Sequence, residues 1–280
     1  MDRREAILRE LNLYPQWVRR GHNVSGAEEP ALATIAGNAE TKAPTSATVI
    51  EPASRLGGGE ADTQRSAMGI AALNPSYVSS PSGGGELARG QEIASSDWTQ
   101  LKDAVRDCSA CRLRPGCTQT VFGVGDENAD WLFVGEGPGA DEDARGEPFV
   151  GEAGKLLDNM LMAIKLKRGK NVYIANIVKC RPPDNRNPSA DEIAQCLPYL
   201  QRQIELIRPR LIVALGKVAS NSLLGKEATL ASLRGTLHDY HGIPLIVTYH
   251  PAYLLRSPSE KAKSWQDLCL AVKTMEGIVS

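Results

Sequence analysis

The stretch that decides the fold is Trp131-Leu132-Phe133-Val134-Gly135-Glu136-Gly137-Pro138-Gly139. Its four large apolar residues form an unbroken run, which predicts a strand buried on both faces. The glycines and the proline that follow predict that the strand ends in a tight loop. A strand of this kind belongs inside a sheet that is covered by helices on both sides.

Three further apolar runs follow, with room for a helix between most of them. We predict strands at Val172–Ala175, Leu211–Leu215 and Leu245–Val247, and helices at residues 154–166, 189–208 and 217–224. Alternating strands and helices predict an α/β fold whose parallel sheet lies between two helical layers. Because ligands of such sheets bind beyond the carboxyl ends of the strands, the loops after the strands are where we expect the functional site.

The N-terminal third has a different composition. Residues 21–95 are rich in Gly, Ala, Ser, Pro, Thr and Glu and lack apolar periodicity, which predicts a disordered linker. Before it, residues 1–20 predict a short amphipathic helix with Ile7 and Leu8 on its apolar face. That helix either docks on its own domain or binds a partner protein. A globular domain is predicted to span residues 96–280.

Charge and composition exclude some classes of protein. The net charge is −1 and the pI about 6.5, so binding to nucleic acid by bulk positive charge alone is excluded. No apolar run reaches the ~20 residues of a membrane helix, and the first residues do not resemble a secretory signal. We therefore expect a cytoplasmic protein without a membrane partner, in which six cysteines serve as metal ligands or core residues rather than in disulfides.

Four cysteines have the layout of a metal site. Cys108 and Cys111 are two residues apart, which lets both thiolates face one centre, and Cys180 and Cys196 follow later in the chain. Four thiolates suit either structural zinc or a [4Fe–4S] cluster, and the spacing does not choose between them. Cys117 has no matching partner and is expected not to be a ligand.

The loop after the first strand carries glycines and carboxylates. Gly135 and Gly137 allow a planar ligand to approach the backbone, and Glu136 or Glu142 could stabilise positive charge or orient water. The same glycines loosely match a dinucleotide fingerprint. That interpretation is disfavoured because Pro138 sits in the turn and carboxylates follow where a pyrophosphate would bind.

Three later loop residues suit recognition of a base. Phe149 lies between proline and glycine, where a ring is better placed for stacking on a ligand than for packing in a core. Asn176 offers a donor and an acceptor that match the edge of a pyrimidine. His250 follows a strand and precedes a proline, which is a position typical of catalysis. Taken singly, each residue also fits a purely structural role.

Basic and apolar residues near the same loops suit contact with DNA. Cations would contact phosphates, and apolar side chains beside them would wedge into the base stack. The residues predicted for these two roles are Lys179, Arg181, Arg186, Tyr253, Leu254 and Arg256.

These motifs together resemble the iron–sulfur type, or family 4, of the uracil-DNA glycosylase superfamily. The resemblance covers about residues 98–275 and rests on five ordered motifs and the four cysteines. The motifs are Gly135–Gly139, Glu142-Asp143, Gly146–Gly154, Asn176–Pro183 and His250–Arg256.

The resemblance implies a four-stranded parallel sheet and a [4Fe–4S] cluster held by Cys108, Cys111, Cys180 and Cys196. It also implies hydrolysis of the N-glycosidic bond of uracil in single- or double-stranded DNA, which leaves an abasic site. Uracil would lie against Gly135, Gly137 and Phe149 and pair with Asn176. His250 would stabilise charge on uracil, and Glu142, with Glu136 as second choice, would stabilise the sugar cation or position water.

Two alternatives stay open. One is a glycosylase for other deaminated bases, and the other is a non-catalytic iron–sulfur protein that binds nucleic acid. The non-catalytic protein would not need Phe149, Asn176 and His250 all at strand ends. We expect a monomer in either case. If the chain is a repair enzyme, its catalytic domain would be residues 96–280 and the helix predicted at residues 1–20 would recruit a repair or replication protein.

Overall fold

The computed structural model describes residues 83–279. The predicted helix at residues 1–20 and most of the linker predicted at residues 21–95 lie outside the described residues. The end of that linker was predicted wrongly, because helix α2 (Gly83–Ser95) occupies its last part. Ile93 is buried in the core, and Arg89 donates to the side chain and carbonyl of Gln195. A few contacts distant in sequence therefore order a segment whose composition is typical of a linker.

The centre of the fold is one mixed β-sheet with strand order β1-β3-β2-β4-β6-β5. Its four inner strands are parallel to one another, as predicted. They are β2 (Trp131–Gly135), β3 (Val172–Asn176), β4 (Leu211–Leu215) and β6 (Ile243–Thr248). β2, β3 and β4 are buried along their whole length, which explains their continuous apolar runs.

The sheet has six strands, so the expected count of four was too low. The two additional strands, β1 (Val124–Gly125) and β5 (Leu237–Tyr240), are antiparallel edges. β1 has only two residues, and β5 places exposed Leu237 and Asp239 on the surface. Because neither strand is buried on both faces, neither has the apolar run that identifies the inner strands.

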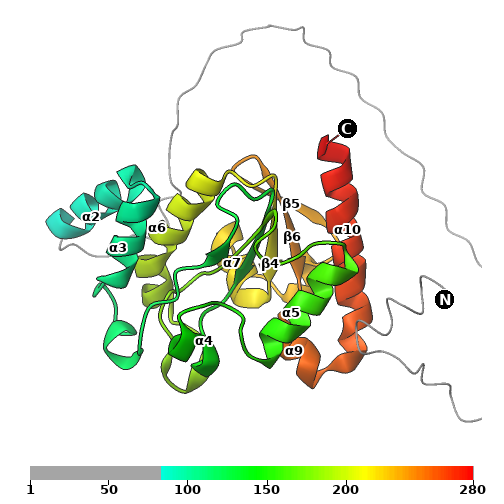
Figure 1. Cartoon of the computed structure of the whole chain (residues 1–280), viewed down its shortest axis with the longest axis horizontal. Coiled ribbons are helices and arrows are strands. Elements are labelled where there is room, and N and C mark those ends of the chain that lie inside the picture. Colours follow the sequence, from blue (N-terminus) through cyan, green and yellow to red (C-terminus); the bar gives the residue numbers. More distant parts are fainter. Residues whose placement is uncertain (1–82, 280) are drawn as a thin grey trace, which may run out of the picture. The chain divides into compact units, whose positions relative to one another are not determined.

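Helices cover both faces of the sheet (Figure 1). On one face, α3, α6 and α7 pack against Leu132, Ala175 and Val247. On the other face, α5 and α10 pack against Phe133 and Val213. The structure thus has the three layers that the sequence predicted. The helices after α2 are α3 (Trp98–Arg106), α4 (Ala140–Arg145), α5 (Glu152–Ala163), α6 (Ala190–Ile207), α7 (Lys217–Leu224), α8 (Leu230–Leu233), α9 (Pro251–Arg256) and α10 (Lys261–Val279).

Local signals explain where the helices that carry the site begin. Ser189 caps α6 by accepting from the Glu192 amide, and the Glu192 carboxylate accepts from the Ser189 amide in return. Asp97 and Gln100 form the same reciprocal box at α3. His250 begins α9, with Pro251 in the first turn. Among the described residues, no helix has the length and apolarity that a membrane span requires.

Candidate active site and cysteine pocket

The predicted site residues meet at the carboxyl ends of the parallel strands. Gly135 ends β2 and pairs in register with Asn176, which ends β3. The Asn176 side chain is 2% exposed, and its Oδ1 has no hydrogen-bond partner within residues 83–279. A buried acceptor of this kind is satisfied when a ligand donates to it. The amide is therefore poised to bind a polar edge.

Phe149 lies beside Asn176, and its placement corrects one expectation. The residue is 5% exposed and belongs to the hydrophobic core on the α5 and α10 side of the sheet, so the expectation of a ring poorly placed for core packing was wrong. A Cβ on Gly135 would come within 2.4 Å of Asn176 Oδ1 and 2.6 Å of Phe149 Cζ, so both side chains lie against this glycine. The centroid of the Phe149 ring lies 5.4 Å from that of His250, with 31° between the planes. We call this grouping of Phe149, Asn176 and His250 the recess.

His250 is held as a neutral hydrogen-bond donor. Its Nδ1 accepts from the amide of Ala252 at 3.2 Å, so the proton of the neutral ring is on Nε2. Burial lowers the pKa of His250 from 6.5 to about 4; nearby Arg256 lowers it further and Glu142 opposes the shift. At neutral pH the ring therefore presents a fixed Nε2–H without carrying charge.

The two predicted carboxylates have different surroundings. Glu142, in the first turn of α4, accepts from the amides of Gly139 at 3.1 Å, Val150 at 2.9 Å and Gly151 at 3.1 Å. These bonds join the β2 loop to the Phe149 loop. Glu136 is partly buried, and burial raises its pKa. Glu142 thus has three backbone partners in the protein, and both carboxylates remain candidates for action on a ligand.

The structure corrects two of the residues predicted to contact DNA. Lys179 is 1% exposed and donates from Nζ to the carbonyl of Asn176 at 3.0 Å and to Oε1 of Gln203 at 2.6 Å. Leu254 is 1% exposed and packs between α5 and α10. Neither can reach a phosphate or a base stack. On α9, the large apolar side chains that are exposed are those of Tyr253 and Leu255.

The other predicted basic residues reach the surface. Arg256 is exposed at the end of α9. Arg181 is partly exposed and donates to Asn185 at 2.8 Å. Arg186 is exposed but pairs with Glu192 at 2.7 and 2.8 Å, and this pairing lowers the pKa of Glu192 to about 2. The Glu192 carboxylate therefore neutralises part of the charge of Arg186 within the protein.

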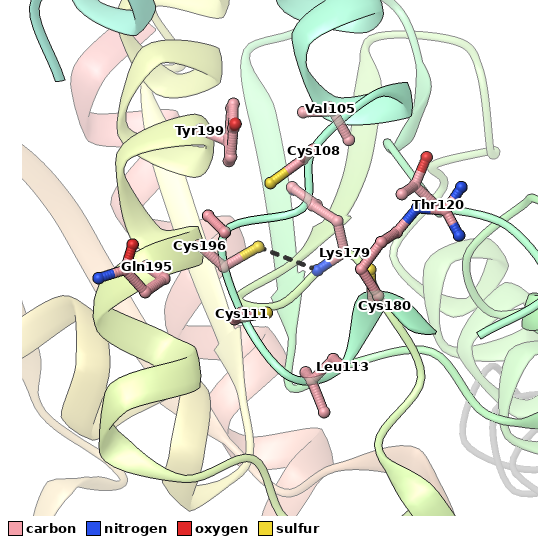
Figure 2. Close-up of a pocket in the computed structure, with 12 residues that line it drawn as sticks. Val105, Cys108, Cys111, Leu113, Thr120, Lys179, Cys180, Gln195, Cys196 and Tyr199 are labelled. Carbon is pink, nitrogen blue, oxygen red and sulfur yellow. Dashed lines mark hydrogen bonds between the residues drawn. The ribbon is translucent and has the colours of Figure 1, made fainter. Parts of the chain in front are cut away.

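All four cysteines predicted as ligands line one pocket between α3, α6 and the chain after β3 (Figure 2). Cys108 and Cys111 follow α3, Cys180 lies four residues after the end of β3, and Cys196 lies on α6. The amide of Lys179 donates to the sulfur of Cys196 at 3.2 Å. Cys117 is buried but does not line this pocket.

The pocket disfavours charge on its thiols. Burial raises the pKa of Cys180 above its usual range and raises that of Cys196 to about 11. A positive centre would thus be needed to hold these residues as thiolates. Within residues 83–279, no three His, Cys, Asp or Glu side chains are close enough together to hold a single metal ion. The sulfurs instead surround a shared space.

Two residues of the site region were missed from the sequence. Arg168 donates to the carbonyls of Pro148 and Phe149 at 2.8 and 2.7 Å, and Gln203 accepts from Lys179. Both lie far along the chain from the residues they hold. Since neither belongs to a strand-end motif, no local signal could have identified them.

Comparisons with known proteins agree with this geometry. The family described as "Uracil DNA glycosylase superfamily" matches residues 122–270. The type-4 uracil-DNA glycosylase of Archaeoglobus fulgidus is 44% identical over 56% of this chain and 84% of its own length. The type-4 enzyme of Thermotoga maritima is 44% identical over 58% and 85%, and that of Pyrobaculum aerophilum is 39% identical over 62% and 92%.

The range matched by the family contains all six strands of the sheet and the loops that follow the parallel strands. Similarity of this extent to several proteins of one type defines a family rather than a shared fold alone. The chain therefore belongs to the uracil-DNA glycosylase superfamily, within its type-4 group.

Proposed function

We propose that the protein repairs DNA by hydrolysing the N-glycosidic bond of uracil, which leaves an abasic site. The observation that carries the proposal is the buried Oδ1 of Asn176, which has no partner within residues 83–279, near the ring of Phe149 and the Nε2–H of His250. The type-4 relatives are named uracil-DNA glycosylases, which agrees with it. We expect the enzyme to act in the cytoplasm.

The ring of Phe149 and the amide of Asn176 together suggest how a base would be recognised. A base flipped out of the stack would lie flat on Phe149 and present its edge to Asn176. Uracil offers the N3–H donor and the O4 acceptor that one amide satisfies in full. Cytosine would place its amino group against the amide nitrogen and leave polar groups unpaired. We propose that thymine is rejected by the shape of the site, which would have to exclude its methyl group.

Bond cleavage places negative charge on the departing base and positive charge on the sugar. His250 would donate from Nε2 to uracil O2 and stabilise that negative charge. Glu136 would stabilise the sugar cation or orient the attacking water. Glu142 would hold the loop that carries Phe149.

DNA would be held around the recess by exposed residues. Arg181, Arg186 and Arg256 supply positive charge, which makes binding sensitive to salt. Tyr253 and Leu255 are 38% and 42% exposed and would fill the gap left by the flipped base. Lys179 has no part in this contact, because it is buried.

We also propose that Cys108, Cys111, Cys180 and Cys196 hold a [4Fe–4S] cluster. The sulfurs surround a pocket, which suits a cluster that takes one thiolate per iron, and the buried thiols need positive charge to ionise. When bound, the cluster would supply cross-links between α3, α6 and the chain after β3. It would act as a structural element and take no part in cleaving the bond.

The cluster can be tested with Cys196. Cys196→Ala is expected to abolish the visible absorption and the bound iron of the purified protein and to lower its melting temperature. Cys269→Ala should keep both, because Cys269 is exposed on α10, away from the pocket lining. Equal iron content in the two variants would contradict this ligand set.

Gly135→Ala is expected to lower kcat/KM for uracil by about a hundredfold, because small displacements of positioning groups have effects of that order. The new Cβ would press on Asn176 Oδ1 and on the ring of Phe149. Steady-state kinetics on an oligonucleotide with one uracil would measure the loss. Gly277→Ala is the control, since nothing lies within 4 Å of a Cβ there and its backbone is not left-handed; equal losses in the two variants would contradict the argument.

His250 also predicts a dependence on pH. Because its pKa is lowered to about 4 in the folded protein, the neutral ring should persist from pH 8 down to pH 5, and kcat should show no inflection near pH 6.5. Below pH 6.5 the unfolded chain binds a proton that the folded chain does not, so the free energy of unfolding should fall. Urea unfolding of wild type and His250→Gln at pH 8 and pH 5 checks this. An equal fall in both would contradict it.

The function itself is tested on a labelled oligonucleotide with one uracil, followed by alkali to cleave abasic sites. Cleavage at uracil and not at thymine is expected. Failure to cleave, from protein whose visible absorption shows a cluster, would refute the proposal. Cleavage only at hypoxanthine would assign the enzyme to another deaminated base.

A further inference from the structure

Two oppositely charged side chains, Arg168 and Glu142, form hydrogen bonds to the backbone of the segment that carries Phe149. Arg168 lies between α5 and β3 and donates to the carbonyl of Pro148 at 2.8 Å and to that of Phe149 at 2.7 Å. Its Nε donates to Asp158 at 3.0 Å, which fixes the guanidinium in place. The side chain is only 19% exposed, so these bonds are largely shielded from water.

Glu142 holds the same segment by accepting hydrogen bonds from two backbone amides of that segment. Its Oε1 accepts from Val150 at 2.9 Å and from Gly151 at 3.1 Å. The carbonyl of Phe149 is thus held by a cation, and the two amides that follow it are held by an anion. We call Arg168 and Glu142 together the Phe149 clamp.

The conformation that the clamp holds is an unfavourable one. Phe149 has φ of +55°, a region that bulky residues rarely adopt. The segment also lies tightly on α5, because a Cβ on Gly154 would come within 1.8 Å of the Phe149 carbonyl oxygen. Backbone strain of this kind persists only where the surrounding structure enforces it.

We propose that Arg168 is a positioning residue for base recognition, which acts by holding Phe149 flat against the base. This inference rests on the proposed function. Without the guanidinium, Phe149 can relax toward negative φ, and its ring then leaves the position beside Gly135 and Asn176. The pocket would still exist but would hold the base loosely, and small misplacements of this kind reduce turnover strongly.

The first test compares Arg168→Met with a matched control. Arg202 is 21% exposed, donates to the carbonyl of Ser96 at 2.8 Å and pairs with Glu205, all away from the strand-end loops. Arg168→Met is expected to lower kcat/KM for uracil about a hundredfold, whereas Arg202→Met leaves it unchanged. Arg168→Lys should lie between, because lysine keeps the charge but cannot grip two carbonyls in a fork. Equal losses in Arg168→Met and Arg202→Met would overturn the inference.

A double-mutant cycle separates positioning from general destabilisation. Phe149→Leu keeps an apolar side chain but removes the flat ring. If Arg168 acts through Phe149, then Arg168→Met adds little to the loss already caused by Phe149→Leu. A further hundredfold loss in the Phe149→Leu background would overturn the inference.

A measurement that does not depend on catalytic activity tests the clamp separately from the proposed function. Hydrogen exchange at the amides of Val150 and Gly151 should be faster in Arg168→Met than in wild type and unchanged in Arg202→Met. If wild type failed to cleave uracil-containing DNA, the proposed function would fall, while faster exchange would still establish the clamp. Unchanged exchange in Arg168→Met would refute the clamp itself.

Discussion

Replacing His250 with alanine is expected to lower kcat by about a hundred- to a thousandfold, with little change in KM. In the proposed mechanism the Nε2–H of His250 would act on charge that develops on uracil O2 only as the bond breaks, so its loss would affect the transition state and not the bound substrate. Its pKa of about 4 means that a neutral donor, and not a cation, supplies this stabilisation. Single-turnover kinetics on the uracil oligonucleotide measure the effect.

Two variants control for that result. His241 is an exposed histidine in the turn between β5 and β6, and His241→Ala should retain wild-type turnover. His250→Gln should recover part of the loss, because its amide nitrogen can still donate. Wild-type turnover in His250→Ala would remove this residue from the mechanism.

Asn176→Asp is expected to have the largest effect on specificity. The exchange keeps the shape of the side chain but replaces the donor to uracil O4 with a second acceptor. Because sites built on hydrogen bonds reject mismatched ligands by about 10⁴-fold, kcat/KM for uracil should fall to that extent. The carboxylate matches the amino group of cytosine, so the ratio of cytosine to uracil cleavage should rise.

The measurement uses matched oligonucleotides that hold uracil, cytosine or thymine at one position. Asn128→Asp adds the same charge at an exposed loop position before β2 and should leave all three rates unchanged. Parallel losses on uracil and cytosine in Asn176→Asp would show that the residue supports the fold and does not read the base.

The sequence predicted those features that depend on position along a strand. Gly135, Asn176 and His250 follow buried apolar runs, and the ends of parallel strands must meet at one edge of the sheet. The edge strands β1 and β5 were not predicted, because they form by pairing with β3 and β6 and their own residues have no strand pattern. Arg168 escaped for a similar reason: its bonds to the Phe149 loop span 19 and 20 residues.

Two residues were wrongly predicted to contact DNA because the sequence does not show which way a side chain faces. Leu254 and Leu255 are neighbours on α9, and a helix turns ~100° per residue, so one faces the core and the other faces solvent. Composition could not reveal which. Lys179 was expected at the surface because its neighbours are cationic, yet the chain stays buried from Val172 to Cys180 and its ammonium group is satisfied by Asn176 and Gln203.

That uninterrupted burial constrains how the gene can change. Only Ile177, Val178 and Lys179 separate the Asn176 amide from the Cys180 thiol, and all three are at most 1% exposed. One inserted or deleted residue would rotate either Asn176 out of the recess or Cys180 out of its pocket. If both sites act as proposed, this interval can accept only substitutions that fit the core, and its length must be inherited unchanged.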